Sequence, residues 1–374
     1  MNPAIQLLWL TLAHVPGLGP RGRAALVKRF PSIEALFAAD RAALETALHD
    51  SLASFSDRAD PGAAIAAILR GPETRAFVPD LTWLAEERHH LISWGDADYP
   101  ALLREIPDPP LVLYVHGERS ALSQPQLAIV GSRNPTPLGA QNASAFARVL
   151  AQSGLAITSG LALGIDAAAH RGALEAEGKT IAVAGTGLDR VYPARHRDLA
   201  HRIAAEGALV SEFPIGTPAR AEHFPVRNRL ISGLSLGVLV VEAALKSGSL
   251  ITARLAAEQG REVFALPGSI HSPLARGCHA LIRQGAKLVE TAEHVLEELG
   301  PLAQVTRQAV PQSEAPELAP LEHRLFDCLG HDPMHMDALI DRSGLTADIV
   351  SSILLQLELR GLVLVGPGGY QRAS

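Results

Sequence analysis

The chain has 374 residues, of which 47% are hydrophobic and 19% charged, so it is long enough for two or three domains with a sizeable core. This composition excludes a disordered or fibrous chain, and two cysteines without a CxxC pair exclude a disulfide scaffold and a structural zinc finger. No apolar stretch approaches the ~20 residues that a transmembrane helix needs, and no signal peptide is recognisable. We therefore expect a cytoplasmic protein without a membrane anchor.

The net charge of −6 is unevenly distributed along the chain. Residues 1–124 carry a net charge of −4, residues 125–287 a net charge of +6, and residues 288–374 a net charge of −8. A basic segment within an acidic chain fits a surface that binds a polyanion, although chance clustering would give the same pattern. The acidic carboxyl-terminal region argues against strong DNA binding there, because phosphate contacts need Lys or Arg.

Residues 1–70 predict a small domain of short helices. A helical pattern over residues 5–13 is broken at Pro16–Pro20, a second helix follows from Arg21, and Ser32 can cap a third. The glycines between the first two helices resemble a helix-hairpin-helix, whose backbone amides can hold a phosphate. One hairpin is a weak signal, and we favour a plain helical turn.

Beyond residue 126, apolar strands alternate with amphipathic helices. Strands are predicted at 127–130, 155–158, 180–184, 208–211, 238–241, 262–266 and 287–289. Helices are predicted at 138–152, 166–177, 195–205, 227–232, 250–259, 278–284 and 292–299. The pattern is typical of an α/β fold, a Rossmann-like doubly wound sheet that is mostly parallel. Residues 71–124 are mixed, with a buried strand at 111–115, and we assign 71–300 to one extended Rossmann-like domain.

The carboxyl-terminal region divides into a linker and a small domain. Residues 301–320 contain four prolines and predict a Pro-rich linker. Residues 321–374 then predict helices at 321–329, 336–342 and 347–360, followed by a hairpin. This order is that of a winged helix-turn-helix.

Several predicted strands end in small residues. Gly131-Ser132-Arg133, Ser159-Gly160 and Gly185-Thr186-Gly187 all follow apolar strands. In doubly wound folds ligands bind beyond these strand ends, where small residues let an anion approach backbone amides. None of these three segments is a GxGxxG, so the pattern favours a phosphate site over a dinucleotide site.

Two polar clusters follow. Phe224, Arg227, Asn228 and Arg229 offer an aromatic ring for base stacking and cations for phosphates, although two arginines two positions apart on a helix point in different directions. The second cluster, Lys246-Ser247-Gly248-Ser249, follows a strand and opens a helix, which is a good context for a phosphate. Ordinary loop polarity is the alternative for both.

Three other motifs carry less weight. Gly178-Lys179-Thr180 lacks the P-loop glycine and runs from helix to strand, and Gly233-Leu-Ser-Leu-Gly237 is preceded by a helix, unlike a hydrolase elbow. Asp166 and His170 are spaced i,i+4 and could form an acid–base pair. We favour a helix-terminal carboxylate and a packing histidine instead.

Taken together, these segments resemble the DprA/Smf family of DNA-processing proteins. The resemblance rests on segments 95–103, 127–133, 159–170, 224–233 and 247–252, with Glu242 and Pro267-Gly268, in that order and spacing. It covers roughly residues 90–290. Residues 1–70 and 321–374 are similar, with less distinctive sequence, to the helical amino-terminal domain and the winged helix of the family.

The resemblance implies a non-enzymatic protein that needs no cofactor. Members of the family bind single-stranded DNA during natural transformation, protect it, load the RecA recombinase on it, relieve inhibition by single-strand-binding protein, and form homodimers through the Rossmann domain. Carried onto this chain, Ser132 and Arg133 match the GSR element of the DNA pocket, Phe224 the base-contacting aromatic, and Arg227 and Arg229 the RNR element. Lys246 lies in the loop that closes the site.

The transfer departs from the family at one position. A lysine often precedes the aromatic residue in the family, and here Ala221 and Glu222 stand there. The alternative function is a nucleotide-processing Rossmann enzyme of the phosphoribohydrolase type, with Asp166 and Glu242 as its carboxylates, although its PGGxGT signature is absent. A transcription regulator is less favoured, because Arg360 is the one basic residue of the expected recognition helix.

Overall fold

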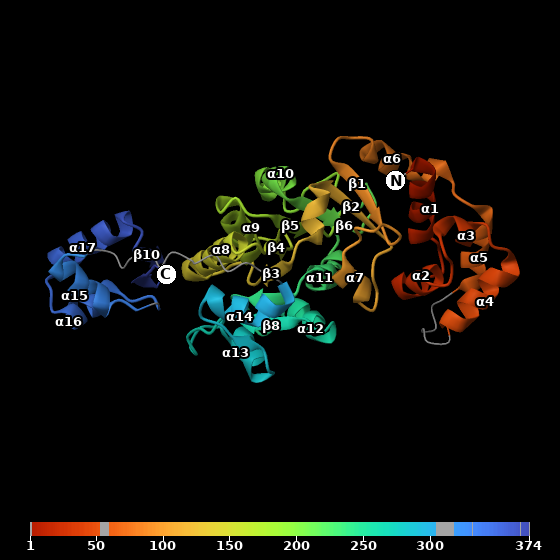
Figure 1. Ribbon diagram of the computed structural model, residues 1–374. Coiled ribbons are helices and arrows are strands. Elements are labelled where there is room, and N and C mark those ends of the chain that lie inside the picture. Colours follow the sequence, from red (N-terminus) through yellow and green to blue (C-terminus); the bar gives the residue numbers. More distant parts are fainter. Residues whose placement is uncertain (1, 53–59, 304–317, 331, 367, 374) are drawn as a thin grey trace.

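The computed structural model describes residues 2–52, 60–303, 318–330, 332–366 and 368–373 (Figure 1). The amino-terminal helices are α1 (Pro3–Ala13), α2 (Pro20–Val27), α3 (Ile33–Phe37), α4 (Arg41–Leu52) and α5 (Pro61–Arg70). Ser32 caps α3, as its sequence position predicts, by accepting a hydrogen bond from the amide of Ala35. The turn glycine Gly17 packs against the backbone of Asp60, and its carbonyl oxygen accepts a hydrogen bond from the Asp60 amide. The α1–α2 turn therefore packs against the start of α5.

Residues 71–124 contain more regular structure than the sequence predicted. Two 3₁₀ helices, two α-helices and two strands occur there: Thr74–Phe77, α6 (Val78–Leu84), β1 (His89–Ser93), α7 (Ala101–Glu105), β2 (Val112–Gly117) and the second 3₁₀ helix at Arg119–Ser123. β1 and β2 form an antiparallel pair that joins the main sheet at β6, because β2 also pairs antiparallel with β6. The buried core of the amino-terminal helices continues through Tyr114 on β2 into the sheet.

The central sheet has nine strands in the order β1-β2-β6-β5-β4-β3-β7-β8-β9. From β3 onwards the strands are β3 (Gln126–Val130), β4 (Ala156–Ser159), β5 (Thr180–Val183), β6 (Ala208–Ser211), β7 (Gly237–Val240), β8 (Glu262–Ala265) and β9 (Lys287–Leu288). These seven pair in parallel, and β3 to β7 are buried along their whole length. The predicted mostly parallel, doubly wound sheet is confirmed.

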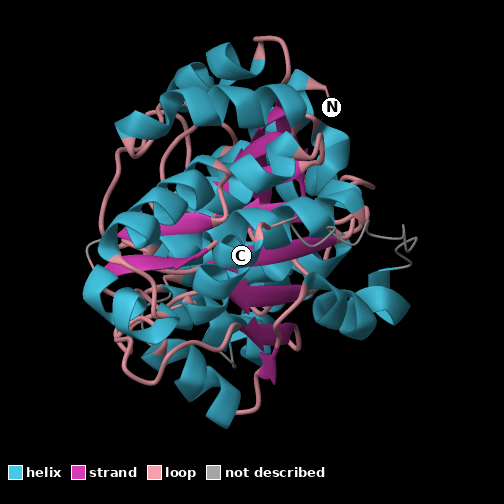
Figure 2. Cartoon of the chain, turned by 90° about the vertical axis from the view of Figure 1, so that its left-hand side faces the viewer, coloured by secondary structure: helices cyan, strands magenta, loops and turns pink. Residues whose placement is uncertain are grey.

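Helices cover both faces of this sheet (Figure 2). The helices of the domain are α8 (Pro137–Gln152), α9 (Ile165–Glu175), α10 (Arg197–Glu206), α11 (His223–Leu234), α12 (Ser249–Glu258), α13 (Arg276–Arg283) and α14 (Ala292–Ala303). Residues of α8, α9 and α14 share one aliphatic core, and residues of α11, α12 and α13 share the core on the other face. The strands β3 to β7 are therefore buried on both sides, which explains their hydrophobic runs in the sequence.

The order of the strands reverses at β3. From β3 the chain moves outward through β4, β5 and β6, then returns to β7 on the opposite side of β3. The loops that leave β3 and β7 consequently run to different faces of the sheet. A crevice opens beyond the carboxyl ends of the two strands, the usual ligand position in this class of fold.

The carboxyl-terminal domain is a winged helix. It consists of α15 (Pro320–Cys328), α16 (Met336–Ser343), α17 (Ala347–Leu359), β10 (Val363–Gly366) and β11 (Gly369–Arg372), around its own aliphatic cluster. It lies beside α8, where Gly366 approaches Pro137 (Figure 1). The predicted linker at 301–320 begins within α14 and ends within α15, and its residues 304–317 lie outside the described residues. Over the described parts of the chain, every helix is too short or too polar to cross a membrane.

Candidate functional site

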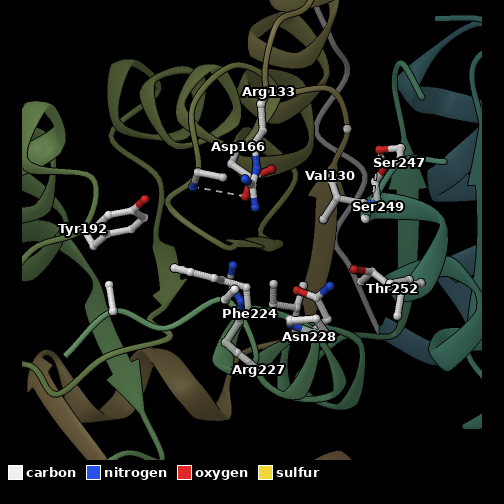
Figure 3. A pocket seen from close by; sticks show the side chains of 18 of the residues that line it. Val130, Arg133, Asp166, Tyr192, Phe224, Arg227, Asn228, Ser247, Ser249 and Thr252 are labelled. Atoms are coloured by element: carbon white, nitrogen blue, oxygen red, sulfur yellow. Dashed lines mark hydrogen bonds between the residues drawn. The ribbon is translucent and has the colours of Figure 1, made fainter. Parts of the chain in front are cut away.

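A cavity of about 670 Å³ opens at the reversal point of the sheet, and we call it the sheet-edge cavity (Figure 3). Its walls come from the β3–α8 loop, the start of α9, the segments that follow β5 and β6, α11, and the start of α12. They comprise Val130, Gly131, Arg133, Ala162, Asp166, Tyr192, Ala219, Arg220, Ala221, Phe224, Pro225, Arg227, Asn228, Ile231, Ser247, Gly248, Ser249, Ile251 and Thr252. Three arginines and one carboxylate face this space, so its charge balance favours an anion.

Arg227 connects the floor of the cavity to the sheet. The side chain is 4% exposed, and its Nη1 donates to the carbonyl oxygens of Gly160 (2.6 Å) and Val183, beyond β4 and at the end of β5. A side chain on Gly160 would meet this guanidinium at 2.5 Å, so glycine is required there for the close approach. Burial lowers the pKa of Arg227 to about 10, which leaves the guanidinium charged at neutral pH.

Phe224 lies at the centre of an aromatic and cationic group. The guanidinium carbons of Arg133 and Arg227 lie 5.9 and 6.0 Å from its ring centroid, and the ring of Tyr192 lies 5.4 Å away, tilted by 37°. Both arginines are within cation–π range of the ring. An aromatic face flanked by two guanidinium groups can hold a planar base next to a phosphate.

Asp166 is the carboxylate of the cavity. It is 6% exposed, sits in the first turn of α9, and its Oδ2 accepts hydrogen bonds from the amides of Gly160 (3.1 Å) and Ala162 (3.2 Å). Burial raises the pKa of Asp166, and the charge of Arg227 and these two amides oppose the rise. Its partners make Asp166 an organiser of the loop after β4, which agrees with the packing interpretation of its sequence position.

His170 does not pair with Asp166. It is fully buried, and its Nδ1 lies 2.7 Å from the hydroxyl of Thr180 on β5. Burial lowers the pKa of His170 to about 3, so the ring is neutral in the folded protein. The acid–base pair considered from the sequence is therefore excluded by the geometry.

The amino terminus of α12 forms the wall opposite Tyr192 (Figure 3). The hydroxyls of Ser247 and Ser249 lie 2.6 Å apart, and Gly248 occupies the cap position without a side chain that would cover the helix end. Hydroxyls and helix-terminal amides are typical ligands of a phosphate. Of the predicted cluster, Ser247, Gly248 and Ser249 thus lie on the cavity wall.

Not every predicted residue lines the cavity. Arg229 points the other way on α11, where its Nε lies 3.3 Å from Asp108 and its Nη2 contacts Glu212. The hydroxyl of Ser159 is buried and donates to the carbonyl of Ile129 (2.6 Å). These contacts belong to the framework of the sheet and α11.

Ser132, Gly160 and Lys246 also lie outside the cavity walls. The hydroxyl of Ser132 accepts from the amide of Asn134 (3.1 Å) within the β3–α8 loop. Gly160 makes room for Arg227. Lys246 is exposed and lines a neighbouring groove between α12 and α13, next to Arg254.

Two cavity residues were not singled out from the sequence. Tyr192 follows β5 and is 53% exposed, and Arg220 lies in the exposed segment before α11. Neither belongs to a recognisable motif, because each lies nine residues after the end of the preceding strand, at Val183 and Ser211. Arg220 places a cation four positions before Phe224.

A second cavity of about 900 Å³ lies next to α8, at the ends of β7, β8 and β9. Its described lining holds three carboxylates (Glu242, Glu290 and Asp332) but neither Lys nor Arg. Glu242 accepts from the amide (2.9 Å) and hydroxyl (2.6 Å) of Thr136, the cap residue of α8. The two carboxylates considered for an enzyme, Asp166 and Glu242, therefore line different cavities.

Comparisons with known proteins identify the family. Residues 90–300 match the family model of DNA recombination-mediator protein A, and residues 309–369 match that of the DprA winged helix domain. The chain belongs to the DNA recombination-mediator protein A family. Protein Smf of Escherichia coli is 46% identical over 303 residues, which cover 80% of this chain and 81% of that protein. DNA processing protein DprA of Bacillus subtilis is 46% identical, over 57% of this chain and 72% of its own length.

Solved structures of the family agree with the fold. DNA processing protein A from Streptococcus pneumoniae superposes with a TM-score of 0.67 at 34% identity and covers 79% of this chain and 98% of its own. A structure of DNA processing protein A from Helicobacter pylori, which concerns its single-stranded DNA binding mode, gives a TM-score of 0.52 at 32% identity, over 58% and 98% of the two chains. The family, the Rossmann-like sheet and the winged helix predicted from the sequence are thereby confirmed.

Proposed function

We propose that the sheet-edge cavity binds single-stranded DNA and that this chain is a recombination mediator rather than an enzyme. The observation that carries the proposal is the group around Phe224, whose ring lies within 6.0 Å of two guanidinium groups in a cavity with three arginines. Single-stranded nucleic acids are bound by this combination of stacking platforms and cations. Relatives named for DNA processing, and the Helicobacter pylori protein named for binding single-stranded DNA, support it.

We assign the following contacts within the cavity. A base stacks on Phe224, and phosphates contact Arg133 and the amino terminus of α12 at Ser247, Gly248 and Ser249. Gly131 and Asn228 line the same space, and Arg227 supports Phe224 from below. We propose no DNA contact for Arg229, because Asp108 and Glu212 both hold its guanidinium. Recognition of this kind reads little base identity.

The arrangement of the carboxylates argues for binding rather than catalysis. Asp166 is engaged by two backbone amides, and Glu242 caps α8 in the second cavity. A nucleotide-processing enzyme would need acid and base on the same substrate. The proposal therefore includes no cofactor and no catalytic residue.

The wider role rests on family membership. We propose that this chain protects incoming single strands in natural transformation, loads RecA on them, counters inhibition by single-strand-binding protein, and acts as a homodimer in the cytoplasm. RecA-dependent strand exchange on DNA coated with single-strand-binding protein tests loading directly. A chain that binds single strands without accelerating this reaction would refute the loading role and leave the DNA site intact.

The DNA site is tested by fluorescence anisotropy with labelled single- and double-stranded oligonucleotides, without nucleotide. We expect preference for the single strand, and loss of it in the variant Arg133→Ala/Phe224→Ala. A matched control, Asn142→Ala/Glu290→Gln, alters two residues of the second cavity and should bind like the wild type. Folded wild-type protein that does not bind single strands would refute the proposal and favour the nucleotide-processing alternative.

A further inference from the structure

One aromatic side chain of the sheet-edge cavity, Tyr192, packs against Phe224 and has not yet been assigned a contact with DNA. Tyr192 is 53% exposed, although an aromatic ring is costly to leave in water. Its hydroxyl has no hydrogen-bond partner among the described residues. Both the ring and the hydroxyl of Tyr192 are therefore available to a ligand.

The position of this ring relative to Phe224 decides what it can do. The two centroids are 5.4 Å apart with an angle of 37° between the planes, so the rings contact each other and leave no space for a base between them. Both rings line the cavity, and Tyr192 is the more exposed of the two (Figure 3). Successive bases of a single strand stack on successive aromatic rings in proteins that bind them.

A second base brings a second phosphate, and the cavity holds a cation for it. Arg220 lines the same cavity, is exposed, and has no carboxylate partner among the described residues. Arg133 already lies over Phe224, and Arg227 is held by two carbonyl groups. Arg220 is thus the arginine of the cavity whose guanidinium is not committed to a ring or to the backbone.

We propose that Tyr192 and Arg220 form a second nucleotide subsite, so that the cavity binds two consecutive nucleotides of a single strand. Tyr192 stacks on the base next to the one on Phe224, and Arg220 contacts a phosphate of the same dinucleotide. This inference rests on the proposed function and deepens it, because it sets the number of nucleotides that one cavity holds.

Affinity measurements on the full chain test the subsite. Tyr192→Ala should weaken binding of a labelled dT20 by about tenfold, within the range found for loss of one base–aromatic stack, whereas Tyr192→Phe should stay within about twofold. Arg220→Ala should lower the salt slope of binding by about 0.7, the value for one phosphate of a single strand. Arg171→Ala, an exposed arginine of α9 outside the cavity, is the matched charge control.

Photocrosslinking gives a readout that a structural role would not move. A dT20 with 5-iododeoxyuridine at single positions should form adducts with two peptides, one containing Tyr192 and one containing Phe224. Adducts at Phe224 alone, with wild-type affinity in Tyr192→Ala, would overturn the second subsite and leave the proposed function standing. Absence of wild-type binding would overturn both. Melting temperatures equal to that of the wild type verify that each variant is folded.

Discussion

The two cavities beside β7 occupy the same edge of the sheet and have opposite character. The sheet-edge cavity has three arginines, one buried carboxylate and two aromatic rings, whereas the described lining of the second cavity has three carboxylates and no Lys or Arg. The second is also the larger, at about 900 against 670 Å³. Neither the position of a cavity at the switch point nor its size is thus enough to predict that it binds a polyanion. The charge and the aromatic content of its lining are the features that distinguish the two cavities.

The largest effect is expected at Arg227. Arg227→Met leaves the carbonyls of Gly160 and Val183 without their donor and Asp166 without a compensating charge, so we expect a loss of about 3–5 kcal/mol in unfolding free energy and no DNA binding. Urea unfolding measures the loss of unfolding free energy. Arg133→Met, exposed on the same cavity, should stay within about 0.5 kcal/mol of the wild type. Equal stability of the two variants would contradict the supporting role of Arg227.

The next effect concerns the ring of Phe224. Phe224→Ala should cost about 1–3 kcal/mol of binding free energy for single-stranded DNA, while Phe224→Trp should retain it, because any aromatic face stacks on a base. Fluorescence anisotropy gives both values. If Phe224→Ala binds as tightly as the wild type, the aromatic content of the cavity does not separate it from the second cavity.

A smaller effect separates the charges of the two cavities. Arg133→Ala should reduce the slope of log K against log salt by about 0.7, whereas Glu290→Gln should leave the slope unchanged. Titrations at several salt concentrations measure both slopes. A change of slope in Glu290→Gln would place DNA near the second cavity as well.

The smallest effect is the pH dependence contributed by Glu242. Burial raises its pKa above the usual 4.5, so as the pH falls the folded state takes up this proton before the unfolded state does. The wild type should therefore gain stability relative to Glu242→Gln as the pH is lowered through the native pKa towards 4.5, without a change in DNA affinity at neutral pH. Unfolding curves at a series of pH values test the sign. The opposite trend would show that the hydrogen bonds from Thr136 lower the pKa of Glu242 by more than burial raises it.

The sequence was informative wherever local pattern decides structure. Buried runs such as Leu127–Val130 located the parallel strands, and the small residues after them indicated the edge at which the cavity lies. The winged helix was equally predictable from its helix spacing. In residues 71–124 the prolines obscured β1, α6 and α7, whose burial depends on contacts with distant parts of the chain.

Side-chain direction was the part that local pattern could not supply. Arg227 and Arg229 are equivalent in the sequence, and Asp108 and Glu212, from remote segments, draw Arg229 away from the cavity. Tyr192 and Arg220 reach the cavity on long segments after β5 and β6, without a spacing that marks them. Lys246 belongs to a segment of which the next three residues face the cavity, but its own side chain lies over the neighbouring groove.

The anchoring of Arg227 to the ends of two strands has a kinetic consequence. A floor fixed to the sheet needs no rearrangement when a ligand arrives, so little protein entropy is lost on binding and the ordering falls on the flexible DNA strand. Association should then be fast and governed by electrostatic steering, and differences among DNA sequences should appear in the dissociation rate. Under the proposed function, such a site should capture strands rapidly and retain them according to how well their bases stack.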